Sequence, residues 1–132
     1  MENLELVEGI ERSPFLSEKE SWIWAAGILE GEGCFSLNKK KDRLNTYISA
    51  IHCEMTDEDV IKSLFEIFKV GNYYPIKKRA DDIIRKPSWR WTVYKQADVF
   101  GVLMKISPYM HSRRKEKISH LIEHLEGRIL GS

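Results

Sequence analysis

Two carboxylates separated by a single glycine, Glu30 and Glu32, follow directly on an apolar run in the sequence. The segment Glu30-Gly31-Glu32-Gly33 falls at the C-terminal end of a predicted helix, where the partial negative charge of the helix makes acids unfavourable neighbours. Its glycines leave backbone carbonyl oxygens accessible. Carboxylate and carbonyl oxygens suit a hard cation such as Mg²⁺, particularly one that is also held by phosphate oxygens. The pattern therefore predicts a divalent-cation site at this point of the chain.

The helix that carries these acids is predicted over residues 17–31. Ser17 followed by Glu20 is a capping-box pattern, in which a serine accepts a hydrogen bond from the first turn. We expect Gly31 and Gly33 to end the helix through a left-handed turn, which glycine tolerates.

The middle of this helix, residues 22–29, is apolar on every side, as is typical of a helix that is buried on every side. The sheet of its own subunit can cover only one side. Gly27 and Gly31 lie four residues apart and permit close approach of another helix. The simplest cover is therefore a second copy of the helix about a two-fold axis, although a central helix within one core is the alternative. We expect the interface to contain Trp24, Gly27, Ile28 and Gly31.

The rest of the chain predicts two hairpins and three more helices. The strands are expected at residues 34–40, 46–55, 72–77 and 89–94, and the helices at residues 57–69, 97–106 and 112–126. The order αββαββαα predicts an α+β fold with a mixed four-stranded sheet and helices on one face. We expect residues 15–130 to form a single domain, preceded by an arm of residues 1–14, because 132 residues suffice for one compact core and not two.

The basic residues are clustered, although the net charge is only +1. Residues 1–20 hold six acidic and two basic residues, a net −4, so the remainder carries +5. Its clusters are Lys39, Lys40, Lys41 and Arg43; Lys77, Lys78 and Arg79; Arg85, Lys86 and Arg90; and Arg113, Arg114, Lys115 and Lys117. Clustered bases are typical of a phosphate-binding surface, while any one cluster alone could be a solvated face.

Two features bear on the compartment. Cys34 and Cys53 lie in strand-like stretches, and we expect both to be buried, reduced thiols. The N-terminus lacks the pattern of a secretory signal, and residues 22–29 are too few to span a bilayer. We therefore expect a protein of the cytoplasm of a prokaryote or phage host, or of an organellar matrix or stroma, and not a secreted one.

The segment from Ala25 to Gly33 resembles the nine-residue LAGLIDADG motif of homing endonucleases, with alanine for the leading leucine and glutamate for both aspartates. The resemblance covers nearly the whole chain after residue 15. It takes in Met55-Thr56-Asp57, Val70-Gly71, Trp89-Arg90-Trp91 and Pro108-Tyr109-Met110. One motif in so short a chain is similar to the homodimeric members, whereas longer members carry two.

This resemblance implies a function. The chain is expected to be a homodimeric, site-specific endonuclease of intron homing, which hydrolyses double-stranded DNA with Mg²⁺ or another divalent cation across a pseudo-palindromic site. An RNA maturase or a non-cleaving DNA-binding protein on the same fold is the alternative.

The resemblance also implies roles for single residues. Glu32 is expected to bind the catalytic metal with the carbonyl of Gly31, and Glu30 to be structural. Arg113 stands where a lysine commonly lies, and because arginine does not exchange protons it would only stabilise charge. Lys115 could share that role. The glutamine that many members place near the end of the second strand to order catalytic water is missing, which leaves Glu54 as the candidate for that role.

The expected DNA-binding surface is the open face of the sheet. Phe35 and Leu37 are expected in the core, and His52 faces DNA if its neighbours Ile51 and Cys53 are core residues. The expected contacts are Ser36, Asn38, Lys40, Arg43, His52, Tyr74, Lys77, Lys78, Arg79, Arg90 and Thr92. His120 and His124 share a helix face without a third ligand, which favours a solvent-exposed face.

Overall fold

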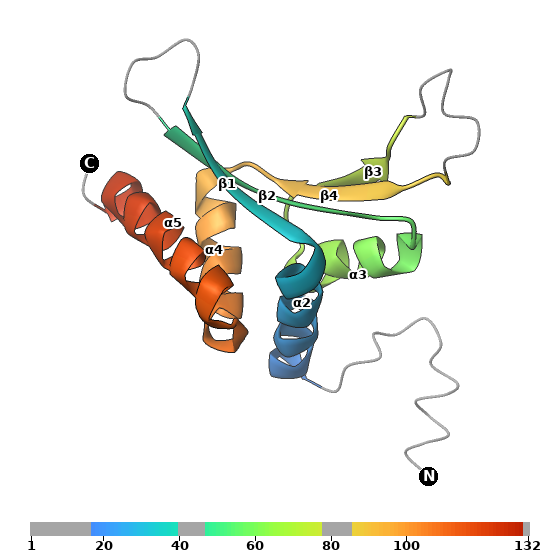
Figure 1. Cartoon of the computed structure of the whole chain (residues 1–132), viewed down its shortest axis with the longest axis horizontal. Coiled ribbons are helices and arrows are strands. Elements are labelled where there is room, and N and C mark those ends of the chain that lie inside the picture. The colour runs from blue at the N-terminus through green and yellow to red at the C-terminus, as the bar shows by residue number, and fades with distance from the viewer. Residues whose placement is uncertain (1–16, 40–46, 78–85, 131–132) are drawn as a thin grey trace.

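The computed structural model describes residues 17–39, 47–77 and 86–130. Its elements are α2 (Glu18–Glu32), β1 (Gly33–Lys39), β2 (Tyr47–Met55), α3 (Glu58–Phe68), β3 (Asn72–Pro75), β4 (Trp89–Val93), α4 (Gln96–Ile106), the 3₁₀ turn η1 (Ser107–Tyr109) and α5 (Ser112–Leu130) (Figure 1). The predicted order αββαββαα is confirmed. The predicted arm and the basic residues Lys40, Lys41, Arg43, Lys78, Arg79 and Arg85 lie outside the described residues.

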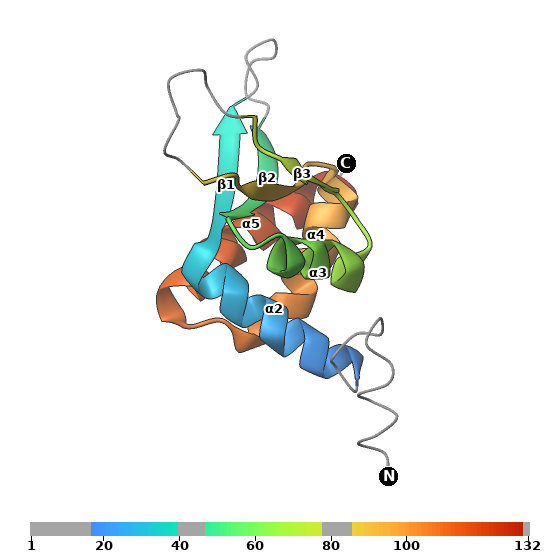
Figure 2. The ribbon, with the colours of Figure 1, turned by 90° about the vertical axis from the view of Figure 1, so that its right-hand side faces the viewer.

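The four strands form one sheet in the order β1-β2-β4-β3. Every neighbouring pair is antiparallel, so the prediction of a mixed sheet is wrong. The reason is the position of β3 at the outer edge: β2 and β3 run in the same direction, but β4 lies between them and runs against both. The helices lie on one face of the sheet, as predicted, and leave the other face open (Figures 1 and 2).

Helix α2 begins as its sequence predicts and ends differently. The Ser17 hydroxyl oxygen accepts a hydrogen bond of 3.1 Å from the backbone N–H of Glu20, which satisfies one of the free donors of the first turn. The helix continues through Glu32, and Gly33 follows with an extended backbone at φ −79°. The predicted left-handed turn is therefore wrong. Glycine is required here by close approach, because a Cβ at Gly33 would lie 2.6 Å from the Leu29 carbonyl oxygen.

The core lies between the sheet and the helices. Its centre is Trp91, which has no exposed surface, stacks on Phe68 at a ring distance of 5.6 Å and donates its indole N–H to the Val70 carbonyl. The buried side chains include Ala25, Ala26, Leu29, Phe35, Ile51, Cys53, Ile61, Leu64, Val93, Val99, Leu103, Ile106, Ile118, Leu121 and Leu125. In the described part of the chain, no helix is long and apolar enough to cross a membrane.

Two expected core residues of β1 are exposed. Leu37 is 40% exposed, and Cys34 is exposed while Cys53 is buried. β1 is an edge strand, paired only with β2, so the side chains along it have fewer neighbours than those of a central strand. The prediction that both thiols are buried is correct only for Cys53.

Candidate active site on the open face

The two carboxylates of the motif have different surroundings. Glu30 Oε1 accepts the backbone N–H of His111 at 2.8 Å and lies 3.4 Å from its Nδ1. Glu30 therefore anchors the residue that precedes α5, a structural contact. Glu32 is exposed and, within the described part of the chain, its side chain makes no hydrogen bond or ion pair. Of the two acids, Glu32 is the one whose oxygens are available to a ligand.

The surroundings of Glu32 fit a hard cation. Gly31 is also exposed, and carbonyls in the last turn of a helix lack a partner within the helix. A carboxylate and such a carbonyl are the oxygen donors that Mg²⁺ accepts. No group of three or more acidic, histidine or cysteine side chains forms a metal cluster in the described residues. A cation at Glu32 would therefore need further oxygen ligands from outside the subunit, such as phosphate or water.

Glu32 opens onto a hollow of about 300 Å³ on the open face of the sheet. The hollow is lined by Glu32, Cys34, His52, Glu54 and Arg90, which come from α2, β1, β2 and β4. Strand pairing places Cys34 opposite His52 and Glu54 opposite Arg90. The fold thus gathers residues that are far apart in sequence beside the acidic end of α2. Sequence reasoning missed Cys34, because its apolar neighbours indicated a buried thiol.

The hollow contains a fixed ion pair and a neutral imidazole. Glu54 Oε1 lies 2.7 Å from Arg90 Nη2, and the hydrogen bonds that Arg90 donates to Glu54 are the first cause that raises the pKa of Arg90. Burial, followed by the charge of Arg90, lowers the pKa of His52. His52 is therefore neutral at pH 7 and offers one donor and one acceptor. Its Nδ1 is buried and has no partner in the described residues.

The face that carries this hollow is polar, as predicted. Ile51 and Cys53 are buried and His52 is half-buried, which confirms the expected register of β2. Asn38, Tyr74 and Lys77 are exposed, and Ser36 and Arg90 are half-buried. Thr92 shares their face, since it pairs with His52 and Asn72, but it is only 1% exposed. The expectation that Thr92 is exposed to a ligand is therefore wrong, because β4 is a central strand on which Thr92 lies between His52 of β2 and Asn72 of β3.

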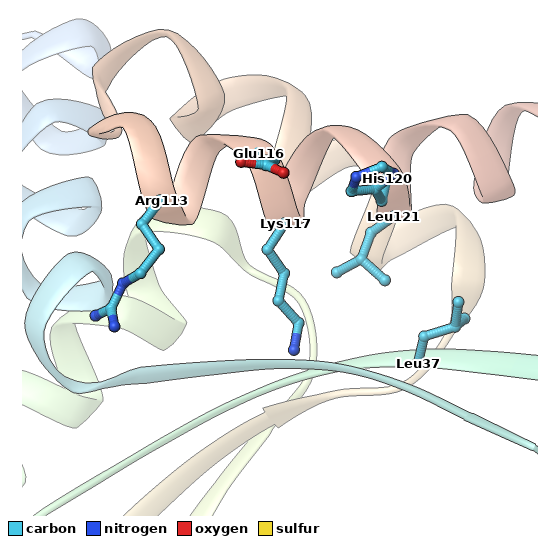
Figure 3. Close-up of a pocket in the computed structure, with 6 residues that line it drawn as sticks. All are labelled: Leu37, Arg113, Glu116, Lys117, His120 and Leu121. Atoms are coloured by element: carbon cyan, nitrogen blue, oxygen red, sulfur yellow. The ribbon is translucent and has the colours of Figure 1, made fainter.

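Two basic residues at the start of α5, Arg113 and Lys115, have different surroundings. Arg113 lines a second hollow of about 420 Å³ with Leu37, Glu116, Lys117, His120 and Leu121. Arg113 and Lys117 extend from α5 toward β1 in this hollow, and the guanidinium of Arg113 lies at the end nearest the start of β1 (Figure 3). Lys115 is exposed and lines neither of these two hollows. The catalytic roles expected for Arg113 and Lys115 stay predictions.

Arg114 contacts the junction of α2 and β1, and sequence reasoning had placed it in a basic cluster without giving it a role in the site. Its Nη1 donates to the Gly33 carbonyl at 2.8 Å, and its guanidinium lies 5.9 Å from the centre of the Phe35 ring. Helical spacing carried the signal: Arg114 precedes the buried residues Ile118, Leu121 and Leu125 at intervals of four, three and four residues, so it lies on the same face of α5.

One side of α2 is left uncovered in the described structure. Ala25, Ala26 and Leu29 pack into the core, whereas Ile23 is 45% exposed. On the same side Gly27 and Gly31 are exposed, and Trp24 and Ile28 are half-buried. A Cβ added at either glycine would meet no atom within 4 Å. The helix is therefore apolar on two sides while the described structure covers one.

The fold is similar to that of solved homing endonucleases. The structure matches I-CvuI in complex with its target in the presence of calcium, with a TM-score of 0.64 and 16% identity, over 83% of this chain and 68% of that one. It matches I-Vdi141I, an archaeal intron-encoded homing endonuclease complexed with DNA, with a TM-score of 0.64 and 16% identity, over 87% and 72%.

A further match is the LAGLIDADG meganuclease I-AabMI bound to uncleaved DNA, with a TM-score of 0.64 and 16% identity, over 82% of this chain and 36% of that one. No family model matches the sequence, and no curated protein matches it in sequence. The chain therefore has the fold of the LAGLIDADG homing endonucleases, which confirms the resemblance at the level of the fold.

Proposed function

We propose that this chain, which has the fold of the LAGLIDADG homing endonucleases, is a homodimer that binds double-stranded DNA and cuts both strands at a partly palindromic site. The observation that carries the proposal is the position of Glu32. Its exposed carboxylate borders a hollow of the open polar face and lies at the end of the helix whose other side is uncovered. A duplex on the open face and a second subunit on α2 would therefore meet at Glu32.

The uncovered side of α2 supports the dimer. Ile23, Trp24 and Ile28 supply apolar area, and Gly27 and Gly31 supply a surface without side chains that another helix can approach closely. A second copy related by a two-fold axis would cover this side with the same residues of its own helix. The axis would then bring two Glu32 side chains together at one duplex, one for each strand.

The chemistry divides between the bound cation and the side chains of the chain. When bound, a divalent cation supplies positive charge that activates water and stabilises charge on phosphate. Glu32 and the Gly31 carbonyl would hold it beside the phosphate that is cut. Ser36, Asn38, His52, Tyr74 and Arg90 face the duplex from the sheet, where their donors and acceptors can contact base edges. Lys77 and Arg113 are long cations that would neutralise phosphates.

The test compares Glu32→Gln with a matched control. Duplexes that bind the wild-type protein are first selected from a random library, and cleavage of plasmids that carry them is then measured with Mg²⁺. Glu32→Gln should bind these duplexes as the wild type does and lose cleavage. Glu66→Gln removes the same charge from the exposed side of α3, away from the open face, and should keep both activities.

The outcomes separate the alternatives. A wild-type protein that binds selected DNA tightly and never cuts it with Mg²⁺ or Mn²⁺ would be a DNA-binding protein on this fold. Tight binding to structured RNA in place of duplex DNA would indicate a maturase. Cleavage retained by Glu32→Gln would reject Glu32 as the metal ligand.

A further inference from the structure

Three side chains form a row across the open face, with Arg90 in the middle. Strand pairing places Glu54 of β2 directly opposite Arg90 of β4, and Tyr74 of β3 opposite Arg90 on its other side. Directly opposed residues in an antiparallel sheet point to the same face and interact. The row therefore has a cation between an acid and a phenol, at the edge of the hollow that contains Glu32.

Hydrogen bonds fix the middle of this row. Glu54 Oε1 accepts from Arg90 Nε at 3.2 Å and from Nη2 at 2.7 Å. The other carboxylate oxygen accepts from the Ser88 hydroxyl at 3.0 Å, so Glu54 is itself held. A hydrogen bond with Tyr74 also contributes to the raised pKa of Arg90. A guanidinium has five N–H groups, and since Glu54 takes two of them and Tyr74 a third, two remain for other partners.

A carboxylate at this place has a cost for a protein that binds DNA. The side chains of Arg90 and Glu54 are 39% and 31% exposed, so both lie where a duplex on the open face would contact them. Glu54 alone would repel phosphates. Arg90 alone would be a flexible cation that attracts any phosphate, and such contacts carry no sequence information. Paired, the two charges offset each other, and the planar fork of Arg90 keeps one orientation.

We propose that Glu54 is a positioning residue that makes Arg90 a reader of base sequence, so that the pair sets a preference for guanine at one position in each half of the DNA target. An oriented guanidinium can donate two hydrogen bonds to O6 and N7 of guanine in the major groove. This inference rests on the proposed function of duplex binding. It assigns Glu54 a role that differs from ordering water, because its carboxylate is already bonded to Arg90 and Ser88.

The test is selection of bound duplexes without divalent metal, followed by affinity measurements at several KCl concentrations. Wild-type protein should select guanine at a symmetric pair of positions, and Arg90→Ala should lose that preference. Glu54→Gln, of the same shape, should reduce the preference about tenfold, within the roughly 5- to 150-fold that a bidentate contact supplies. It should also bind a shuffled duplex more tightly. The plot of log binding constant against log KCl concentration should be steeper by about 0.9 for each subunit, as expected for one added phosphate contact. Glu66→Gln serves as the control for net charge.

Each result decides the matter. The inference fails if Glu54→Gln keeps the guanine preference, or if it weakens all duplexes equally, which a purely structural role would produce. It also fails if no selected position depends on Arg90. Should Glu54→Gln not fold, Ser88→Ala removes one of the two anchors of Glu54 and should shift the preference in the same direction by less. Wild-type protein that binds no duplex would overturn the proposed function as well, whereas duplex binding without the Glu54 effect would overturn only this inference.

Discussion

The uncovered side of α2 can be tested with one methyl group. Gly27 lies in the middle of α2 (Glu18–Glu32), and a Cβ there would meet no atom within 4 Å of its own subunit. Alanine is about 1 kcal/mol more favourable than glycine inside a helix. Within an isolated subunit, Gly27→Ala should therefore raise the unfolding free energy by about 1 kcal/mol, or the melting temperature by roughly 3–5 °C.

The same methyl group should weaken a dimer built on α2. If a second α2 approaches closely at Gly27, the added Cβ lies between the two backbones, and overpacking of this kind costs about 1–3 kcal/mol. The dimer dissociation constant should then rise roughly 5- to 150-fold, since 1.4 kcal/mol corresponds to a factor of ten. One substitution thus has opposite effects on the subunit and on its assembly.

Gly101 provides the matched control. It lies inside α4 (Gln96–Ile106), and a Cβ there also meets no atom within 4 Å. Gly101→Ala should bring the same gain in helix stability without any effect on association. The measurements are sedimentation equilibrium and thermal unfolding over a hundredfold range of protein concentration, because the stability of a dimer depends on concentration. The dimer model would be refuted if Gly27→Ala and Gly101→Ala behaved alike at every concentration.

Two further predictions concern stability and the thiols. Gln96 accepts hydrogen bonds from the N–H and hydroxyl of Ser49 and donates one to its carbonyl, and Ser49 is fully buried. Gln96→Ala leaves these polar groups of Ser49 unpaired and should lower the unfolding free energy, measured by urea titration, by about 1–3 kcal/mol. A loss of less than about 0.5 kcal/mol would show that water replaces the amide. Burial, with a contribution from Glu32, raises the pKa of Cys53 from 9.0 to about 12. The unfolded chain therefore releases a proton above pH 9 that the folded chain keeps, and stability should fall between pH 9 and 12 more steeply than in Cys53→Ala. In the folded protein a thiol reagent should modify exposed Cys34 and spare Cys53, and equal rates for the two would contradict the structure.

Local sequence patterns predicted the helices and strands because these elements depend on residues that are close in sequence. Ser17 and Glu20 predicted the start of α2, and alternation around Ile51 predicted the register of β2. The direction of β4 against β2 was not predictable in this way, since either arrangement buries the same residues. All pairs are antiparallel because β3 lies at the edge of the sheet and β4 runs back between β3 and β2.

The sequence predicted the location of a site residue when that location depends only on the residue's place within its own helix or strand. Glu32 follows an apolar helix, so its location at the helix end was readable from the sequence. The exposure of Cys34 and Leu37 was not, because it depends on β1 being an edge strand. The burial of Thr92 was missed for the opposite reason, because β4 is a central strand and Thr92 has neighbouring residues on both sides, His52 and Asn72.

The sequence by itself determined the helices, the strands and the position of two acidic residues at the end of an apolar helix. Hydrophobic periodicity and residues close in sequence specify these features. Only the tertiary structure decided which acid is engaged and which is available, through the contact of Glu30 with His111 across 81 residues of chain. It also decided that Glu54 holds Arg90 and that Arg114 meets Gly33. Such pairs form between segments that are brought together only when the core packs, and no local pattern in the chain records them.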